Sequence, residues 1–254
     1  MDIEEAGQIA THIEGKPLVI GNHFDATNFN RHMGMPDPLL MVDHFRMRAP
    51  TFGQHPHVGF SAVTYVFEDS TSAHQNWDAM GNFGPIHPGS LHWMVAGKGA
   101  VHNEWPAQEG GETHGLQIFV DLPDSLKTAS PYVMDVASED VPVVIADGMR
   151  VRVVAGMFGK FASPIALPQN FLLLDSFLEV GRSLDLTGQL YGSTWIYVLD
   201  GELTIASQNE TIQLSEERSV AIWAFRSGAL SITSNSGSHF VVLSGDPVRE
   251  VGQS

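Results

Sequence analysis

Residues 54–66 read QHPHVGFSAVTYV, two histidines one residue apart that run into a strongly apolar segment. The apolar part is rich in the β-branched and aromatic residues that favour strands. In an extended chain, residues two apart point to the same face, so His55 and His57 present both imidazoles on one side. Pro56 holds the residue before it in an extended conformation. The stretch therefore predicts a strand that begins with a pair of candidate metal ligands.

A second pair of the same kind lies in residues 97–106, GKGAVHNEWP. His102 and Glu104 are again two apart, so they share a face if this segment is extended. On neighbouring strands, the two pairs would supply three imidazoles and one carboxylate. Such nitrogen and oxygen ligation suits Fe(II), Mn(II), Ni(II), Cu(II) or Zn(II). The coordination positions left open indicate catalysis or ligand capture, because a structural zinc site is normally closed.

Short apolar runs recur along the whole chain between Gly, Pro and Asp residues, and helical periodicity is almost absent. This pattern predicts an all-β sandwich or barrel. The predicted strands are 17–21, 39–46, 60–68, 91–96, 100–104, 116–122, 150–155, 171–180, 194–199, 202–206, 219–225, 230–233 and 240–243. A helix of a turn or two is expected at 124–129.

A weak internal repeat predicts two copies of one β-domain. The similar segments are VTYVFED at 63–69 with WIYVLDG at 195–201, and HGLQIFV at 114–120 with HFVVL at 239–243. We expect an N-terminal domain at 1–135 and a C-terminal domain at 136–254.

The amino-acid composition excludes several classes of function. The chain has 254 residues, with 13 Lys and Arg against 29 Asp and Glu, and a formal net charge of −16. This charge argues against direct binding to nucleic acid or to an anionic membrane. The first residues, MDIEE, have the wrong charge for a signal peptide, and no apolar run approaches the ~20 residues of a membrane span. The chain has no cysteine, which excludes disulfides, thiolate catalysis and Cys-based zinc sites. We expect a cytoplasmic protein.

Eleven of the 12 histidines lie at or before residue 114, which places any metal or acid–base chemistry in the N-terminal half. We expect His74 in an exposed turn, with a place in the wall of the pocket as the alternative. We expect His114 to pack or hydrogen-bond at the start of its strand, with an orienting role toward a ligand left open. In the second repeat, the positions equivalent to His55 and His57 by counting from the strand are Thr187 and Gln189, so the C-terminal domain is expected to bind no metal.

Between residues 38 and 123 the chain resembles the pirin family, bicupin proteins of the cupin superfamily. The matching motifs are PLLMVDHF (38–45), HPHxGF (55–60), VTY (63–65), GN (81–82), PG (88–89), HWMxAGxG (92–99), HxExP (102–106) and HGLQ (114–117). The resemblance implies two cupin-type, jelly-roll β-barrels packed together. It implies one iron in the N-terminal barrel, with His55, His57, His102 and Glu104 as its ligands, and a degenerate C-terminal barrel.

Some pirins have quercetin 2,3-dioxygenase activity, and a eukaryotic member is a nuclear transcriptional co-regulator. The leading hypothesis is therefore a mononuclear non-haem dioxygenase that cleaves a flavonol-like, quercetin-type aromatic enol with O₂. Fe(II) is the first choice of metal, with Mn, Ni, Cu or Zn as alternatives. Glu104 is the candidate catalytic base, because it is the ligand able to accept a proton. The alternatives are a redox-responsive interaction protein or transcription co-regulator that binds a protein partner without turnover, and a zinc hydrolase or isomerase.

Three positions depart from the family pattern. Val58 stands where Arg is usual, and Ser61 where Glu is common. His92 stands where Gln is frequent, which predicts an additional imidazole near the substrate. The roles of His74, His92 and His114 are left open.

Overall fold

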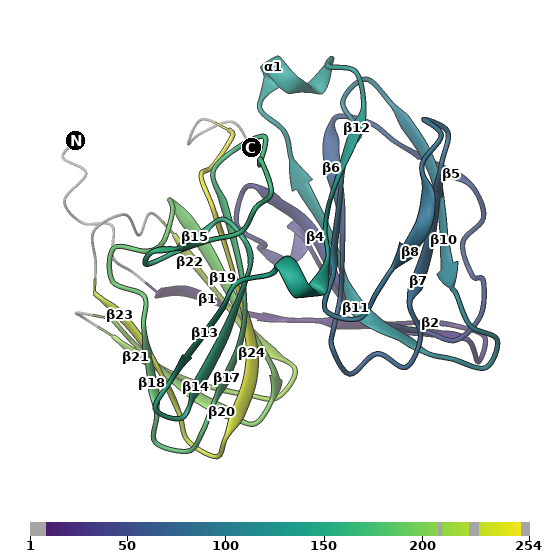
Figure 1. Cartoon of the computed structure of the whole chain (residues 1–254). Coiled ribbons are helices and arrows are strands. Elements are labelled where there is room, and N and C mark those ends of the chain that lie inside the picture. The colour runs from purple at the N-terminus through teal and green to yellow at the C-terminus, as the bar shows by residue number, and fades with distance from the viewer. Residues whose placement is uncertain (1–8, 208–209, 224–228, 250–254) are drawn as a thin grey trace. The chain divides into compact units, whose positions relative to one another are not determined.

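The computed structural model describes residues 9–207, 210–223 and 229–249, and nearly all of its regular structure is β-strand (Figure 1). The α-helix α1 (Asp124–Lys127) lies where a short helix is predicted. Residues 1–5, on which the expectation about a signal peptide depends, lie outside the described residues, as do the last two residues of the predicted strand 219–225. Among the described residues, no helix has the length and apolar character needed to cross a membrane.

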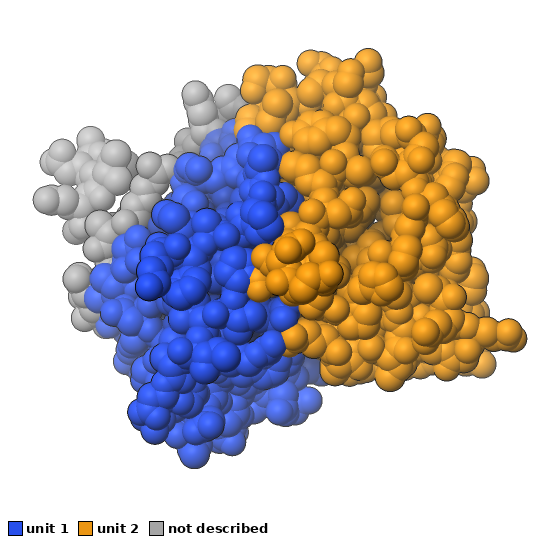
Figure 2. All heavy atoms as spheres, viewed as in Figure 1, with its two compact units in different colours: residues 1–15, 31–38, 142–254 blue, residues 16–30, 39–141 orange. Residues whose placement is uncertain are grey.

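The chain forms two compact units, which Figure 2 shows in different colours. The histidine-rich unit contains residues 16–30 and 39–141. The C-terminal unit contains, as far as they are described, residues 1–15, 31–38 and 142–254. The domain limits 1–135 and 136–254 stay a prediction.

The histidine-rich unit consists of two antiparallel sheets. A seven-stranded sheet has the order β12-β9-β6-β11-β4-β3-β2, and a four-stranded sheet has the order β5-β10-β7-β8. The strands are β2 (Lys16–Ile20), β3 (Phe24–Asn30), β4 (Leu39–Met47), β5 (His55–His57), β6 (Phe60–Val66), β7 (His74–Asp78), β8 (Phe83–Ile86), β9 (Leu91–Val95), β10 (Ala100–Pro106), β11 (Thr113–Asp121) and β12 (Tyr132–Val136).

The C-terminal unit repeats this strand order. Its seven-stranded sheet has the order β1-β22-β19-β24-β17-β14-β13, and its four-stranded sheet has the order β18-β23-β20-β21; β15 and β16 form a separate pair. The strands are β1 (Ile9–Glu14), β13 (Val143–Ala146), β14 (Met149–Ala155), β15 (Met157–Phe158), β16 (Phe161–Ala162), β17 (Phe171–Leu178), β18 (Ser183–Asp185), β19 (Ser193–Asp200), β20 (Glu202–Ser207), β21 (Thr211–Ser215), β22 (Arg218–Trp223), β23 (Leu230–Ser234) and β24 (Ser238–Gly245). Two antiparallel sheets per unit are typical of jelly rolls and cupins, so the predicted all-β class of cupin type is confirmed.

The repeat predicted from the sequence corresponds to equivalent strands. β6 and β19 hold the same place in their seven-stranded sheets, and so do β11 and β24. The edge strands are drawn from different parts of the chain. β1, the first strand in sequence, pairs with β22 of the C-terminal unit, whereas β12 pairs with β9 in the histidine-rich unit.

The interiors of the two units differ. The C-terminal unit has a continuous core of 19 buried aliphatic and aromatic residues, which includes Leu174, Ile196 and Val242. In the histidine-rich unit, one cluster joins Phe24 and Phe45 on β3 and β4, and another joins Ala62, Met94, Ala96 and Ala100 around β6, β9 and β10. Polar residues and a cavity lie among these strands, and they form the candidate site.

Candidate metal centre

Three imidazoles converge where β5 pairs with β10. The register places His55 opposite His102, and Ala100 opposite His57. The Nε2 atom of His102 lies 2.9 Å from Nε2 of His57 and 3.1 Å from Nε2 of His55. One ring nitrogen from each of the three residues falls within 4.8 Å of the others. The structure therefore brings together the three histidines that the two-residue spacings single out.

The protonation of these rings fits a bound cation. His55 donates a hydrogen bond from Nδ1 to the carbonyl oxygen of Gly53 at 2.8 Å, which leaves its Nε2 lone pair directed at the centre. The pKa of His57 is lowered to about 3, chiefly by burial and then by the neighbouring His102 and His55. Burial also lowers the pKa of His102. Neutral imidazoles with their Nε2 atoms crowded together are the ligand form that a divalent transition metal requires.

Glu104 lies beside this group and is not one of its three members. Its Oε1 accepts a hydrogen bond of 2.7 Å from the Thr64 hydroxyl, and its Oε2 lies 3.9 Å from Nδ1 of His102. Burial raises the pKa of Glu104. The charges of His102, His74 and His92 and the hydrogen bond from Thr64 lower it by a larger amount, so the net shift is downward. Glu104 is therefore a buried carboxylate with one oxygen held by Thr64. Its roles as ligand and base stay predictions.

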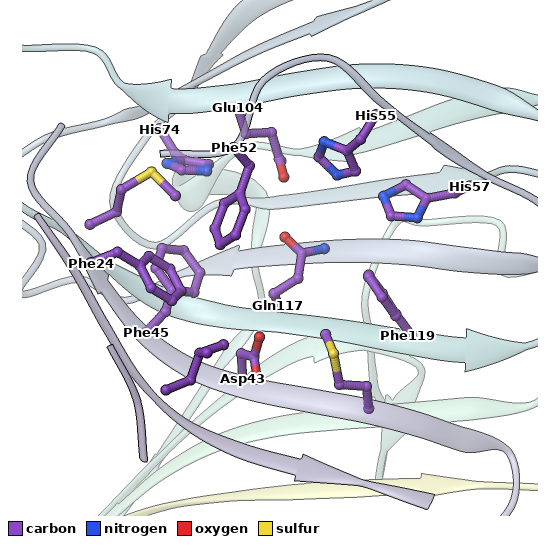
Figure 3. Close-up of a pocket in the computed structure, with 13 residues that line it drawn as sticks. Phe24, Asp43, Phe45, Phe52, His55, His57, His74, Glu104, Gln117 and Phe119 are labelled. Carbon is purple, nitrogen blue, oxygen red and sulfur yellow. The ribbon is translucent and has the colours of Figure 1, made fainter. Parts of the chain in front are cut away.

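A cavity of about 320 Å³ opens beside the three histidines (Figure 3). It is lined by Leu18, Phe24, Met41, Asp43, Phe45, Met47, Phe52, His55, His57, His74, Glu104, Gln117 and Phe119. Figure 3 shows His55, His57 and Glu104 on one side, Asp43 on the opposite side and Gln117 between them. The volume and the mixture of aromatic walls with a few polar groups are typical of a small-molecule site.

The expectation that His74 lies in an exposed turn is wrong. His74 is buried on β7 and lines the cavity, and its Nδ1 has no hydrogen bond among the described residues. Burial lowers its pKa. The strand was missed because its buried face carries His74, Asn76 and Asp78, so hydrophobicity does not alternate along it.

A row of polar residues crosses the seven-stranded sheet and was not predicted. In register from one strand to the next it consists of Asn28, Asp43, Gln117, Thr64, His92 and Asp135. Thr64 also contacts Gln117, with 3.2 Å between its hydroxyl and Oε1. Asp43 accepts a hydrogen bond of 2.5 Å from Asn28, and burial raises its pKa to about 6. The sequence does indicate that Asp43 is unusual, because this acidic residue interrupts the otherwise apolar start of a strand, LLMVDHF.

His92 belongs to this row and is not among the residues that line the cavity. It is buried, and its Nδ1 lies 2.6 Å from Oδ1 of Asp135, whose side chain is exposed. Burial lowers the pKa of His92, but the hydrogen bond and charge of Asp135 raise it more. His114 forms hydrogen bonds at the start of β11, as expected, with Asp69 and with His44, both at 2.7 Å.

The C-terminal unit has different residues at the equivalent strands. By strand order, β18 corresponds to β5 and β23 to β10, so the counterparts of the histidine pair lie in Ser183–Asp185. The expected counterparts Thr187 and Gln189 lie beyond that strand, because the connection has a different length in the two units. Leu184 and Ile232 of this strand pair belong to the hydrophobic core.

A family profile and individual relatives both identify the same family. The sequence profile of the family described as Pirin matches residues 4–120. Pirin of Rattus norvegicus is 32% identical over 217 residues, which cover 85% of this chain and 74% of the rat protein. A Pseudomonas aeruginosa protein whose name suggests quercetin 2,3-dioxygenase activity is 33% identical over 235 residues, which cover 84% of this chain and 77% of that protein.

Two solved structures share the fold. A quercetin 2,3-dioxygenase from Acinetobacter baumannii superposes with a TM-score of 0.82 and 24% identity, covering 96% of this chain and 88% of that chain. The bacterial pirin YhhW of Escherichia coli, in complex with nickel(II), has a TM-score of 0.72 and 20% identity, with coverage of 93% and 99%.

Proposed function

The chain belongs to the pirin family, and on that premise we propose that it is a mononuclear non-haem metal dioxygenase that cleaves a flavonol-like, quercetin-type aromatic enol with O₂. The observation that carries this proposal is the convergence of three imidazoles, of which His55 and His57 line a cavity together with aromatic side chains. The names of the Pseudomonas and Acinetobacter relatives support the choice of substrate. The proposed compartment is the cytoplasm.

In this proposal His55, His57 and His102 hold the metal, with Glu104 as the fourth ligand. Fe(II) is the first choice and Mn, Ni, Cu or Zn are alternatives; the nickel(II) complex of a relative shows that this fold can hold a divalent ion. When bound, the metal supplies Lewis acidity toward an enol oxygen and, in the case of iron, redox exchange with O₂.

The residues of the chain have three tasks. Phe24, Phe45, Phe52 and Phe119 exclude water and hold a planar ring system. Glu104 accepts the proton of the enol hydroxyl at Oε2, because Oε1 is held by Thr64. The buried Thr64 hydroxyl keeps the carboxylate oriented while that proton moves.

Turnover of quercetin tests the proposal. Metal-free protein is loaded with Fe(II), Mn(II), Ni(II), Cu(II) or Zn(II) in separate samples, and quercetin absorbance and O₂ consumption are followed together. We expect equimolar loss of both with at least one metal, and none with metal-free protein. Full occupancy without turnover by any of the five metals would contradict the proposal and favour a metal-dependent interaction protein.

A further inference from the structure

Asp43 is a buried carboxyl group that lines the cavity on the side opposite His55 and His57 (Figure 3). It lies on β4, and its exposed fraction is 8%. The other residues of this face of β4 are Met41, Phe45 and Met47, which also line the cavity. The carboxyl is therefore surrounded along its own strand by apolar side chains.

One oxygen of Asp43 is left for a ligand. Within the described part of the chain, the side chain has one hydrogen bond, in which Asn28 donates to Oδ1. No Lys or Arg is among the residues that line the cavity. A carboxylate placed in apolar surroundings without a cationic partner is unfavourable unless something donates to it. Among the described residues, Oδ2 of Asp43 is thus a hydrogen-bond acceptor without a donor.

The neighbouring polar residues are already engaged. Thr64 donates to Glu104, and the Gln117 amide lies 3.3 Å from the carbonyl oxygen of Val63. Gln117 sits between Glu104 and Asp43 in the cavity. The cavity therefore has two separate polar ends: the histidines with Glu104 at one, and Asp43 at the other.

We propose that Asp43 is a specificity-determining residue that accepts a hydrogen bond from a hydroxyl group at the end of the ligand remote from the histidines. The ligand class is a planar aromatic molecule with an enol at one end and a phenolic hydroxyl at the other. A carboxylate, sulfate or phosphate at the remote end is disfavoured, because it would meet a like charge. This inference rests on the proposed function, since it takes the enol end to lie at the histidines.

Two flavonols that share the enol test this assignment. Quercetin carries phenolic hydroxyls on its outer rings, and 3-hydroxyflavone lacks them. The protein is loaded with Zn(II) and kept without O₂, so that binding is measured by tryptophan fluorescence without turnover. A hydrogen bond to a charged acceptor predicts that the wild-type protein binds quercetin roughly tenfold or more tightly than 3-hydroxyflavone.

The variant Asp43→Asn should lose this preference. The amide oxygen can still accept from Asn28, but the NH₂ group that replaces Oδ2 is a donor and meets the ligand hydroxyl as a second donor. The matched control is Asp124→Asn, because the Asp124 side chain is 97% exposed on α1. Its affinity ratio should equal that of the wild-type protein. Metal content and circular dichroism verify that both variants are loaded and folded.

The outcomes separate the two proposals. If Asp43→Asn keeps the wild-type affinity ratio, or turns over quercetin with an unchanged KM, the role of Asp43 is refuted and the dioxygenase proposal stands. A wild-type protein that binds both flavonols equally refutes the role of Asp43 as well. If the wild-type protein binds neither flavonol and shows no quercetin turnover, both proposals fail.

Discussion

Replacing Asp43 with Asn should stabilise the metal-free protein at pH 7.5, and the gain should shrink to about a fifth as the pH falls to 4. Burial raises the pKa of Asp43 from the ordinary 3.8 to about 6 in the folded protein. The folded state therefore binds the proton more tightly than the unfolded state does. Ionised Asp43 therefore destabilises the fold fully above pH 6, progressively less between pH 6 and 3.8, and not at all well below the ordinary pKa.

The magnitude follows from the two pKa values. Each pH unit between them corresponds to about 1.36 kcal/mol, so the ionised carboxyl costs about 3 kcal/mol of unfolding free energy at pH 7.5. About half of that remains at pH 5, and about 0.6 kcal/mol at pH 4. The amide of Asp43→Asn is neutral throughout and keeps an oxygen for the Asn28 hydrogen bond. The variant should gain these amounts relative to the wild-type protein.

Urea unfolding of chelator-treated protein at several pH values measures this difference. The slope with urea should be unchanged, so that the midpoint reports stability. Asp124→Asn serves as the control and should show no such pH-dependent gain, because its side chain is 97% exposed. A stability gain that is equal at pH 7.5 and pH 4, or absent at both, would refute a buried, ionised carboxyl at position 43.

Three further outcomes concern the candidate metal centre. Alanine at His55, His57 or His102 should remove most bound metal, as measured by elemental analysis, whereas alanine at the exposed His87 should not; full occupancy in His55→Ala would show the site to be wrong. Metal should be lost as the pH falls toward 3, because protons compete with metal for the ring nitrogens and the pKa of His57 is lowered to about 3; metal content unchanged at pH 3 would contradict this. Glu104→Gln at metal saturation should lower kcat by roughly 10²–10⁴-fold if Glu104 is the base, and full activity at neutral pH would leave it a ligand at most.

The alternation of side chains between the two faces of a strand is a local pattern, and the sequence predicts the features that depend on it. Both pairs of candidate ligands follow from the two-residue period of a strand, and the structure places His55 opposite His102. The apolar strands follow from local patterns of the same kind. Strands with polar residues on their buried face, above all β7 with His74, escape this signal because burial there does not correspond to hydrophobicity.

Long-range pairing could not be predicted from local patterns. β1 pairs with β22, with His12 opposite Val220, and nothing in either segment specifies the other. The position of Asp43 opposite Gln117 likewise depends on the register of β4 and β11, which lie about 70 residues apart and are set by tertiary packing. Asp43 belongs to a motif that resembles the family, but its place in the cavity depends on the fold.

The two units show that the fold does not require the polar row. In the C-terminal unit, the row that crosses β14, β17, β24, β19 and β22 in register consists of Val153, Leu174, Val242, Ile196 and Val220. The sequence repeat aligns Thr64 with Ile196 and Gln117 with Val242, so the same sheet positions are aliphatic in one unit and polar in the other. Aliphatic side chains there complete a continuous core. Polar side chains in the histidine-rich unit interrupt it, and one of them, Asp43, destabilises the fold when ionised. A carboxyl group at a position where it destabilises its own domain is best explained by what it binds, and Asp43 lines the same cavity as His55 and His57.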